Sequence, residues 1–278
     1  MSYEVLGAGA LDYAPCRYEG SRILFRGPLR RLDQPYVAFL GGTDTYGKFI
    51  EAPFPALLEN SIGINCVNFG IANAGVDVFL SDNFLRNAAN SARVTVLQVV
   101  GAQNLSNRFY TVHPRRNDRF LKASETLMAI FPEIDFSEFH FTRHVLSALF
   151  AVSPDRFVSV RNELQQAWTN RMKTLCRMLE GKTLLLWFSE HAPLSKENHA
   201  VDPIRQKDPW FVTRHMLREL SDYVSEYQEV VASEAAIQAG TKGMVFSEME
   251  SLAARRLLGL QAHAEAAAAL GPTLLKLK

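Results

Sequence analysis

The sequence has little cysteine and no long hydrophobic run, and both absences narrow the classes of protein that it can encode. Cys16, Cys66 and Cys176 are the only cysteines among 278 residues, and their spacing fits neither a metal motif nor a disulfide framework. An odd, small count favours a reducing compartment. No apolar run approaches the ~20 residues that a membrane helix needs, and Glu4 and Asp12 near the start do not fit a secretory signal. We therefore expect a cytoplasmic protein without a membrane span.

The charge balance has no bias towards either sign. Lysine and arginine number 30 against 29 acidic residues, which leaves a formal net charge of +1, so we expect no nucleic-acid partner. The spacing G-x-x-x-x-G-K-[ST] of a phosphate loop is absent. His140 and His144 would share one face of a helix, but no third ligand follows at a recognisable spacing. We therefore predict no metal and no cofactor.

The stretch at residues 36–59, YVAFLGGTDTYGKFIEAPFPALLE, organises the chain. It predicts a short buried strand at residues 37–40, a glycine turn, a polar tip and then a helix. A short apolar run ended by glycines is typical of a parallel strand covered on both faces, and glycine lets the backbone approach a bound group closely. Ligands of open α/β sheets bind beyond the carboxyl ends of strands, where this tip falls. Ordinary helix caps use the same residue types, so the stretch alone favours a site only weakly.

Four further apolar runs predict strands that end at residue 68, span residues 94–99 and 183–188, and lie near residue 230. Helices are expected between them, for example at residues 76–89, at 162–180, where apolar residues recur at helical spacing, and at 210–224. This alternation predicts the α/β class, with a five-stranded, mainly parallel sheet in a three-layer α/β/α domain. We expect one domain over residues 1–278, with an irregular lead-in at 1–35 that holds a short edge strand at 22–25, a helical insertion at 108–155 and C-terminal helices at 245–278. Those last helices pack on the domain or form a homo-oligomer contact.

Strand, glycine tip, helix, strand, N-F-G loop, strand and G-A-Q-N loop follow one another over residues 36–105, and in this order they resemble the SGNH (GDSL-type) hydrolase family. The resemblance implies a flavodoxin-like parallel sheet and a hydrolase or acyltransferase that acts on an ester, such as an acylated carbohydrate. It places Thr43 at the nucleophile and His263 at the catalytic base. Threonine replaces the family's serine, and Leu260 stands where the acid of a triad is expected, with Glu248 or Glu250 as substitutes.

The whole chain is also similar to a set of uncharacterised alphaproteobacterial proteins, a domain-of-unknown-function family. That set shares the runs GGT-x-TYGKF and GAQN-x-SNRFY-x-VHPRRNDRF. This similarity implies no activity.

The predicted site combines the resemblance with the polar residues near the strand ends. Thr43 and His263 are its catalytic candidates. Oxyanion or ligand-binding roles are expected for Gly42, Asp44, Thr45, Gly70, Asn73, Gly75, Gln103, Asn104, Asn107, Arg108, Arg115 and Arg116. The arginines suit a carboxylate, sulfate or phosphate, while a solvated loop with Asp118 paired to a neighbouring arginine is about equally favoured.

Two other functions fit the sequence. One is a sulfotransferase-type group transferase that holds a nucleotide sulfate on the first turn and Lys48. The other is a non-catalytic binding protein that has kept the sheet and lost the triad.

Overall fold

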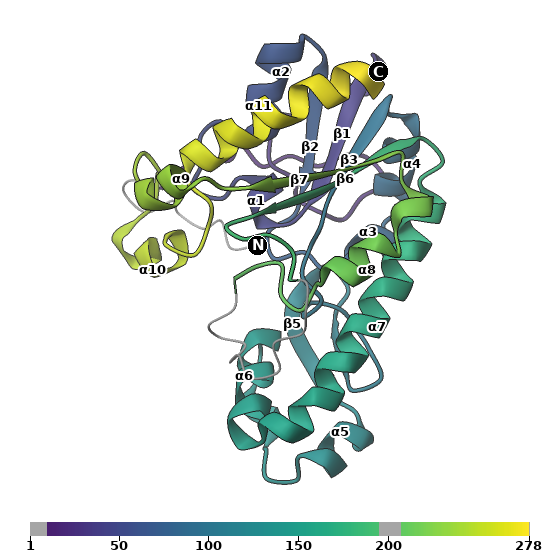
Figure 1. Cartoon of the computed structure of the whole chain (residues 1–278), viewed down its shortest axis with the longest axis vertical. Helices are drawn as coiled ribbons and strands as arrows, with labels where there is room; N and C mark the ends of the chain where they lie inside the picture. Colours follow the sequence, from purple (N-terminus) through teal and green to yellow (C-terminus); the bar gives the residue numbers. More distant parts are fainter. Residues whose placement is uncertain (1–9, 195–206, 278) are drawn as a thin grey trace.

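A computed structural model describes residues 10–194 and 207–277 of the chain (Figure 1). Five parallel strands form one sheet in the order β2-β1-β3-β6-β7. Their bounds are β1 Tyr36–Gly41, β2 Asn65–Gly70, β3 Val94–Gln98, β6 Lys182–Ser189 and β7 Glu226–Val231. The predicted five-stranded parallel sheet is confirmed. Because the chain moves from β1 to β2 on one side and returns to β3 on the other, the strand order reverses between β1 and β3, which is where open α/β sheets bind ligands.

Helices cover both faces of the sheet and make three layers (Figure 1). Along β1, Tyr36, Ala38 and Leu40 join one apolar cluster, while Val37 and Phe39 join the other. This alternation is the two-residue period of a strand, and burial on both faces explains why the run is continuously apolar. The first cluster is covered by α3 Val76–Ser81, α4 Asn83–Ser91 and α7 Pro154–Met178, and the second by α2 Phe54–Ile62 and α11 Leu260–Leu277.

Helix ends differ from the prediction where capping residues decide them. The helix expected at residues 76–89 is two helices, because Asp82 leaves helical geometry and its carboxylate accepts the N–H of Leu85 at the start of α4. Helix α7 begins earlier than expected, since Ser153 caps it by accepting the N–H of Arg156. The helix expected at residues 210–224 is only α8 Arg214–Arg218 followed by the short turn η3 Ser221–Tyr223.

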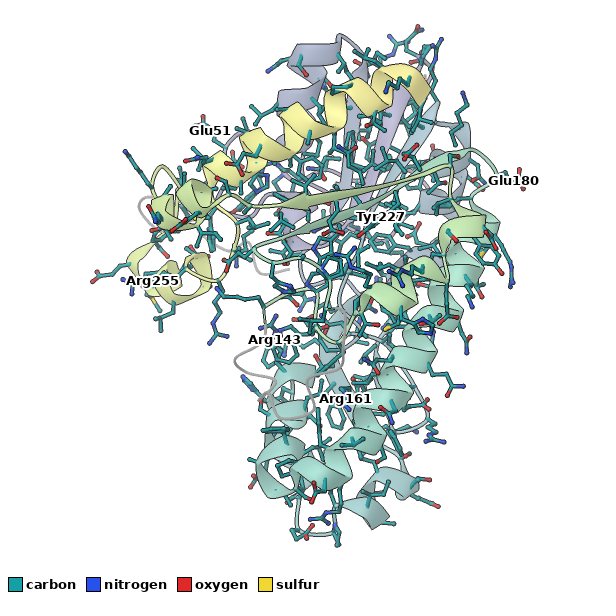
Figure 2. All side chains as sticks on the ribbon, in the orientation of Figure 1. Glu51, Arg143, Arg161, Glu180, Tyr227 and Arg255 are labelled. Carbon is teal, nitrogen blue, oxygen red and sulfur yellow. The ribbon has the colours of Figure 1, made fainter. Side chains whose placement is uncertain are left out.

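The predicted helical insertion at residues 108–155 is only partly helical. It opens with the antiparallel hairpin of β4 Tyr110–His113 and β5 Arg116–Ala123, and continues with α5 Glu125–Ile130, η1 Phe136–Glu138 and α6 Thr142–Val152. His113 closes the hairpin, because its Nδ1 accepts the N–H groups of Arg115 and Arg116, each at 3.2 Å. The insertion and the first half of α7 form a lobe beyond one end of the sheet (Figure 1). Arg143 lies where this lobe meets the rest of the domain (Figure 2).

The two end segments complete the fold. The short edge strand expected at residues 22–25 is only an isolated bridge between Cys16 and Phe25. After β7 the chain forms α9 Glu234–Ala239, η4 Glu248–Glu250, α10 Ser251–Ala254 and α11. One face of α11 packs on the domain through a stripe of buried residues, so that face serves the core; an oligomer contact by other faces stays a prediction. Within the described ranges, no helix combines the length and apolarity needed to cross a membrane.

Candidate functional site

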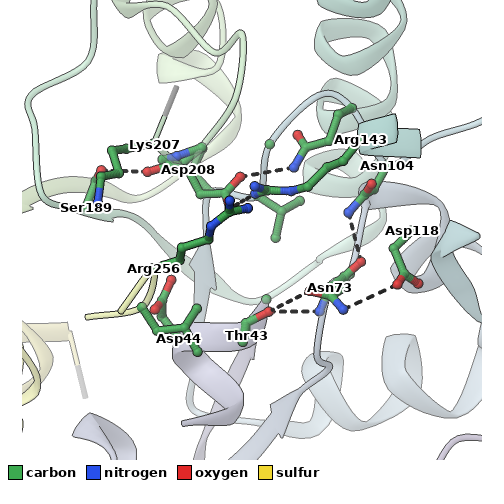
Figure 3. Close-up of a pocket in the computed structure, with 18 of the residues that line it drawn as sticks. Thr43, Asp44, Asn73, Asn104, Asp118, Arg143, Ser189, Lys207, Asp208 and Arg256 are labelled. Atoms are coloured by element: carbon green, nitrogen blue, oxygen red, sulfur yellow. Dashed lines mark hydrogen bonds and ion pairs between the residues drawn. The ribbon is translucent and has the colours of Figure 1, made fainter. Parts of the chain in front are cut away.

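A cavity of about 290 Å³ opens at the carboxyl ends of β1 and β3 (Figure 3). This volume is near the lower end of the range for small-molecule sites, about 300–1,000 Å³. The loops after β1, β2, β3 and β6, the insertion and the C-terminal segment all contribute to its walls. Its polar lining includes Thr43, Asp44, Asn73, Gln98, Gln103, Asn104, Asp118, Thr142, Arg143, His144, Ser189, Glu190, Lys207, Asp208 and Arg256.

The turn after β1 is fixed from below by Gln98, the last residue of β3. Its Oε1 accepts hydrogen bonds from the N–H of Gly42 at 3.0 Å, the N–H of Thr45 at 3.2 Å and the hydroxyl of Thr45 at 2.5 Å. A side chain at Gly41 would come within 2.2 Å of Thr45 Oγ1, so glycine is required there. Thr45, predicted to bind a ligand, is fully buried and instead anchors the turn. Thr43 and Asp44 are left facing the cavity.

Thr43 belongs to a network that joins three loops. Its Oγ1 accepts the N–H of Asn73 at 2.9 Å, and its hydroxyl donates to Asn73 Oδ1 at 3.4 Å. The Asn73 amide donates to Asp118 at 3.3 Å, and the Asn104 amide donates to the Asn73 carbonyl at 3.0 Å. Asn73 has φ 56°, in the left-handed region that costs most residues about 1 kcal/mol or more but that asparagine adopts readily. The network holds the loop after β2 against the Thr43 hydroxyl.

Asp44 is the cavity residue with the most strongly shifted titration. Burial first, and then the negative charges of Asp208 and Glu190, raise its pKa to about 7, although hydrogen bonds from the Leu258 backbone and the Gln98 side chain act in the opposite direction. At neutral pH this carboxyl group is therefore divided between its protonated and ionised forms. A group in that state both accepts and releases protons, as general acid–base catalysis requires.

A second carboxylate, Asp208, is held rigidly on the opposite wall. Gln103 Nε2 donates to its Oδ1 at 3.0 Å, and Arg143 forms an ion pair with its Oδ2. Ser189 Oγ donates to its backbone carbonyl at 2.6 Å. The Arg143 guanidinium also lies 4.2 Å from the ring centre of Trp210. Arg143 thereby connects the insertion to the wall of the cavity.

The structure brings together five of the residues predicted for the site: Gly42, Asp44, Asn73, Gln103 and Asn104 line the same cavity as Thr43. Gly70 and Gly75 do not line it. Their N–H groups, expected to face an oxyanion, already donate to Asn68 Oδ1 at 2.8 Å and Asn117 Oδ1 at 3.0 Å.

The predicted cluster after β3 points elsewhere. Asn107 closes a turn by accepting the N–H of Phe109 at 2.8 Å. Arg108 pairs with Glu163 at 3.0 Å, and Arg115 and Arg116 are exposed at the end of the β4–β5 hairpin. None of these four residues lines the cavity.

His263, predicted as the catalytic base, is buried in the core between α11 and the sheet. Its Nδ1 accepts the N–H of Phe54 at 3.1 Å, and its ring packs against Phe54 and Phe188. Burial lowers its pKa to about 3, so the ring stays neutral. It does not line the cavity, because α11 begins at Leu260 and its first turn directs this side chain inward. From this segment the cavity instead receives residues 256–258.

The other histidines contribute little to the site. His144 lines the cavity from α6, but His140 lies before that helix in extended chain, so the two do not share a helical face. His191 follows β6 without lining the cavity, and His199 lies outside the described residues. Over residues 10–194 and 207–277, no group of three or more His, Cys, Asp or Glu is arranged to hold a metal.

The sequence analysis missed the residues that complete the walls: Arg143, Glu190, Lys207, Asp208 and Arg256. Glu190 follows β6 directly and was accessible to the same strand-end argument that selected Thr43. The remaining four come from the insertion and from loops, where no local pattern marks a cavity-facing side chain.

Comparison with known proteins gives a family and a distant structural likeness. The family model described as "Domain of unknown function (DUF6473)" matches residues 1–278. No curated protein sequence matches the chain. Among solved structures, the lipase Lip_vut3 from a goat rumen metagenome is similar, with 11% sequence identity, a TM-score of 0.40 and coverage of 85% of this chain and 97% of the lipase chain. A likeness of this degree says nothing about activity.

Proposed function

The chain belongs to the DUF6473 family of domains of unknown function, and we propose that its cavity is the active site of an ester hydrolase or acyltransferase in which Asp44 transfers the proton. The observation that carries this proposal is a carboxyl group with a pKa of about 7 that lines the same cavity as Thr43. General bases are most effective when their pKa lies near the working pH. Asp44 takes the role that the sequence analysis gave to His263.

In the proposed reaction, ionised Asp44 accepts the proton of the Thr43 hydroxyl as Thr43 Oγ1 attacks the ester carbonyl carbon. The N–H of Asn73, 2.9 Å from Oγ1, stabilises negative charge on that oxygen as the proton leaves. Collapse of the tetrahedral intermediate breaks the bond to the alcohol, which takes the proton from Asp44. Water, or an acceptor alcohol, then releases the acyl group from Thr43 by the same proton transfers.

The oxyanion of the intermediate needs donors that the fold has not already used. Each primary amide carries two N–H groups, and for Asn73 and Asn104 one of them lies in a hydrogen bond within the protein. We assign the second N–H of each to the oxyanion. Donors of this kind contribute about 10²–10³-fold to the rate in acyl-transfer enzymes.

The test is release of nitrophenol from short-chain nitrophenyl esters by purified protein. Thr43→Ala and Asp44→Asn are each expected to lower kcat/KM about 100-fold or more. The matched controls are Thr174→Ala and Asp222→Asn, exposed positions outside the cavity, which are expected to retain wild-type rates. A wild-type protein that releases no nitrophenol and forms no adduct with a fluorophosphonate probe contradicts the proposal and favours a binding protein without turnover.

The sulfotransferase alternative has less support from the geometry. The N–H groups of Gly42 and Thr45, which would hold the phosphosulfate, both donate to Gln98. Lys48 lies 3.9 Å from Glu250 and 4.7 Å from the ring centre of Phe49, outside the cavity. Two N–H groups of the turn are therefore already used within the protein, and Lys48 does not reach the cavity.

A further inference from the structure

Among the residues that the structure describes, three cationic side chains line the cavity, each from a different part of the chain. Arg143 comes from α6 in the insertion, Lys207 from the segment before Trp210, and Arg256 from the loop between α10 and α11 (Figure 3). The sequence analysis offered Arg115 and Arg116 for an anion site, with a solvated loop as an equally favoured alternative, and both residues are exposed. The cations that line the cavity are therefore a different set of residues.

Two of the three cations are already neutralised by carboxylates of the cavity wall. Arg143 pairs with Asp208, and Lys207 Nζ pairs with Glu190 Oε2 at 3.0 Å. Arg143 is further fixed over the Trp210 ring. Both charges serve the protein's own structure.

Arg256 differs from these two. It is exposed, it extends into the cavity (Figure 3), and no ion pair or hydrogen bond of its guanidinium is found within residues 10–194 and 207–277. Its guanidinium is thus available to a ligand.

We propose that the cavity selects ligands that carry an anionic oxygen group, and that Arg256 binds this group. This inference rests on the proposed function in one respect, which is that the ligand is taken to be the ester substrate. A guanidinium presents paired N–H donors that match a carboxylate, a sulfate or a phosphate. A substrate bound in this way has its ester at Thr43 and a negatively charged substituent at the mouth of the cavity.

Direct binding is tested by calorimetric titration of the full chain with inorganic phosphate, inorganic sulfate and acetate in separate experiments, which also distinguishes the three anions. Arg256→Met is expected to weaken binding of the preferred anion about tenfold or more, as for loss of a charge-assisted hydrogen bond. Arg255→Met is the matched control, because Arg255 is the exposed neighbour that does not line the cavity and lies at the outer edge of this segment (Figure 2). Arg256→Lys keeps the charge and removes the fork, so an intermediate loss is expected.

A second readout uses the enzyme reaction. The ratio of kcat/KM for nitrophenyl hemisuccinate, which carries a carboxylate, to that for neutral nitrophenyl butyrate is expected to fall about tenfold in Arg256→Met and to be unchanged in Arg255→Met.

The inference is overturned if wild-type protein binds none of the three anions, or if Arg255→Met weakens binding as much as Arg256→Met does. Saturable anion binding that depends on Arg256, in a protein that hydrolyses no ester, leaves the anion site standing and removes the proposed function. Ester hydrolysis that depends on Asp44, in a protein that binds none of the anions, supports the proposed function and removes the anion site.

Discussion

Gln98 and Thr45 form the contact that fixes the candidate site: the Thr45 hydroxyl donates to Gln98 Oε1 at 2.5 Å, and both side chains are buried. The same oxygen accepts the N–H groups of Gly42 and Thr45. One side-chain carbonyl at the end of β3 thus replaces the hydrogen bonds that the turn after β1 would otherwise make to water. The geometry of Thr43 and Asp44 depends on this oxygen.

Replacing Gln98 with leucine is therefore expected to destabilise the protein. Three buried donors lose their acceptor, and an unsatisfied buried polar group costs about 1–3 kcal/mol. Because relaxation of the turn lets some donors find other partners, we expect a decrease of roughly 3 kcal/mol in the free energy of unfolding. Urea denaturation measures it, with Gln238→Leu on the exposed face of α9 as the control. Equal stability of the two variants contradicts the anchoring role of Gln98.

The pH dependence of ester hydrolysis tests the assignment of Asp44 as base. The reaction needs the ionised form, and the pKa of this carboxyl is raised to about 7. We expect kcat/KM to rise about tenfold per pH unit below this value and to level off above it. Asp44→Asn removes the rising limb together with most of the activity. If the residual activity of Asp44→Asn still rises with pH in the same way, the titrating group is not Asp44.

Asp44 also predicts a dependence of stability on pH. Its pKa is about 7 in the folded state and 3.8 unfolded, so the unfolded chain releases its proton first as pH rises. Stability is therefore lost between about pH 4 and pH 7, by up to about 4 kcal/mol. Asp44→Asn lacks this titration, and we expect it to be more stable than wild type at pH 8 and about equal at pH 4. Thermal or urea unfolding at the two pH values measures the difference, and an Asn variant that is less stable at pH 8 contradicts the shift.

The sequence was sufficient to predict the sheet and one side of the cavity. The apolar run and paired glycines at β1 place Thr43 at a strand end, and the run at β3 places Gln103 and Asn104 beside it, because parallel strands end at the same edge. Arg143, Asp208 and Arg256 could not be predicted in this way. They reach the cavity through the tertiary placement of an insertion and two loops, and hydrophobic periodicity carries no information about such placement.

The position of His263 was, by contrast, readable from periodicity. Ala262, His263, Ala266, Ala267 and Leu270 form one buried stripe at helical spacing on α11. A residue on such a stripe packs against the sheet, whatever position it holds relative to a family motif. The resemblance matched motifs by their order along the chain. It therefore took no account of which face of the helix carries His263.

Substitutions of His263 separate a structural role from a catalytic one. Its ring fills a site between Phe54 and Phe188 and supplies an acceptor to the Phe54 N–H. His263→Ala removes both, so we expect a loss of roughly 2–4 kcal/mol in the free energy of unfolding. Asparagine can restore an acceptor, so His263→Asn is expected to be more stable than the alanine variant. It is also expected to hydrolyse esters within a few-fold of wild type, because an imidazole outside the cavity cannot accept the proton of Thr43.

A folded His263→Asn protein that has lost its activity would return the role of base to this histidine. The comparison of unfolding free energy and kcat/KM in the same two variants decides between the roles, since only a catalytic role lowers the rate without lowering the stability.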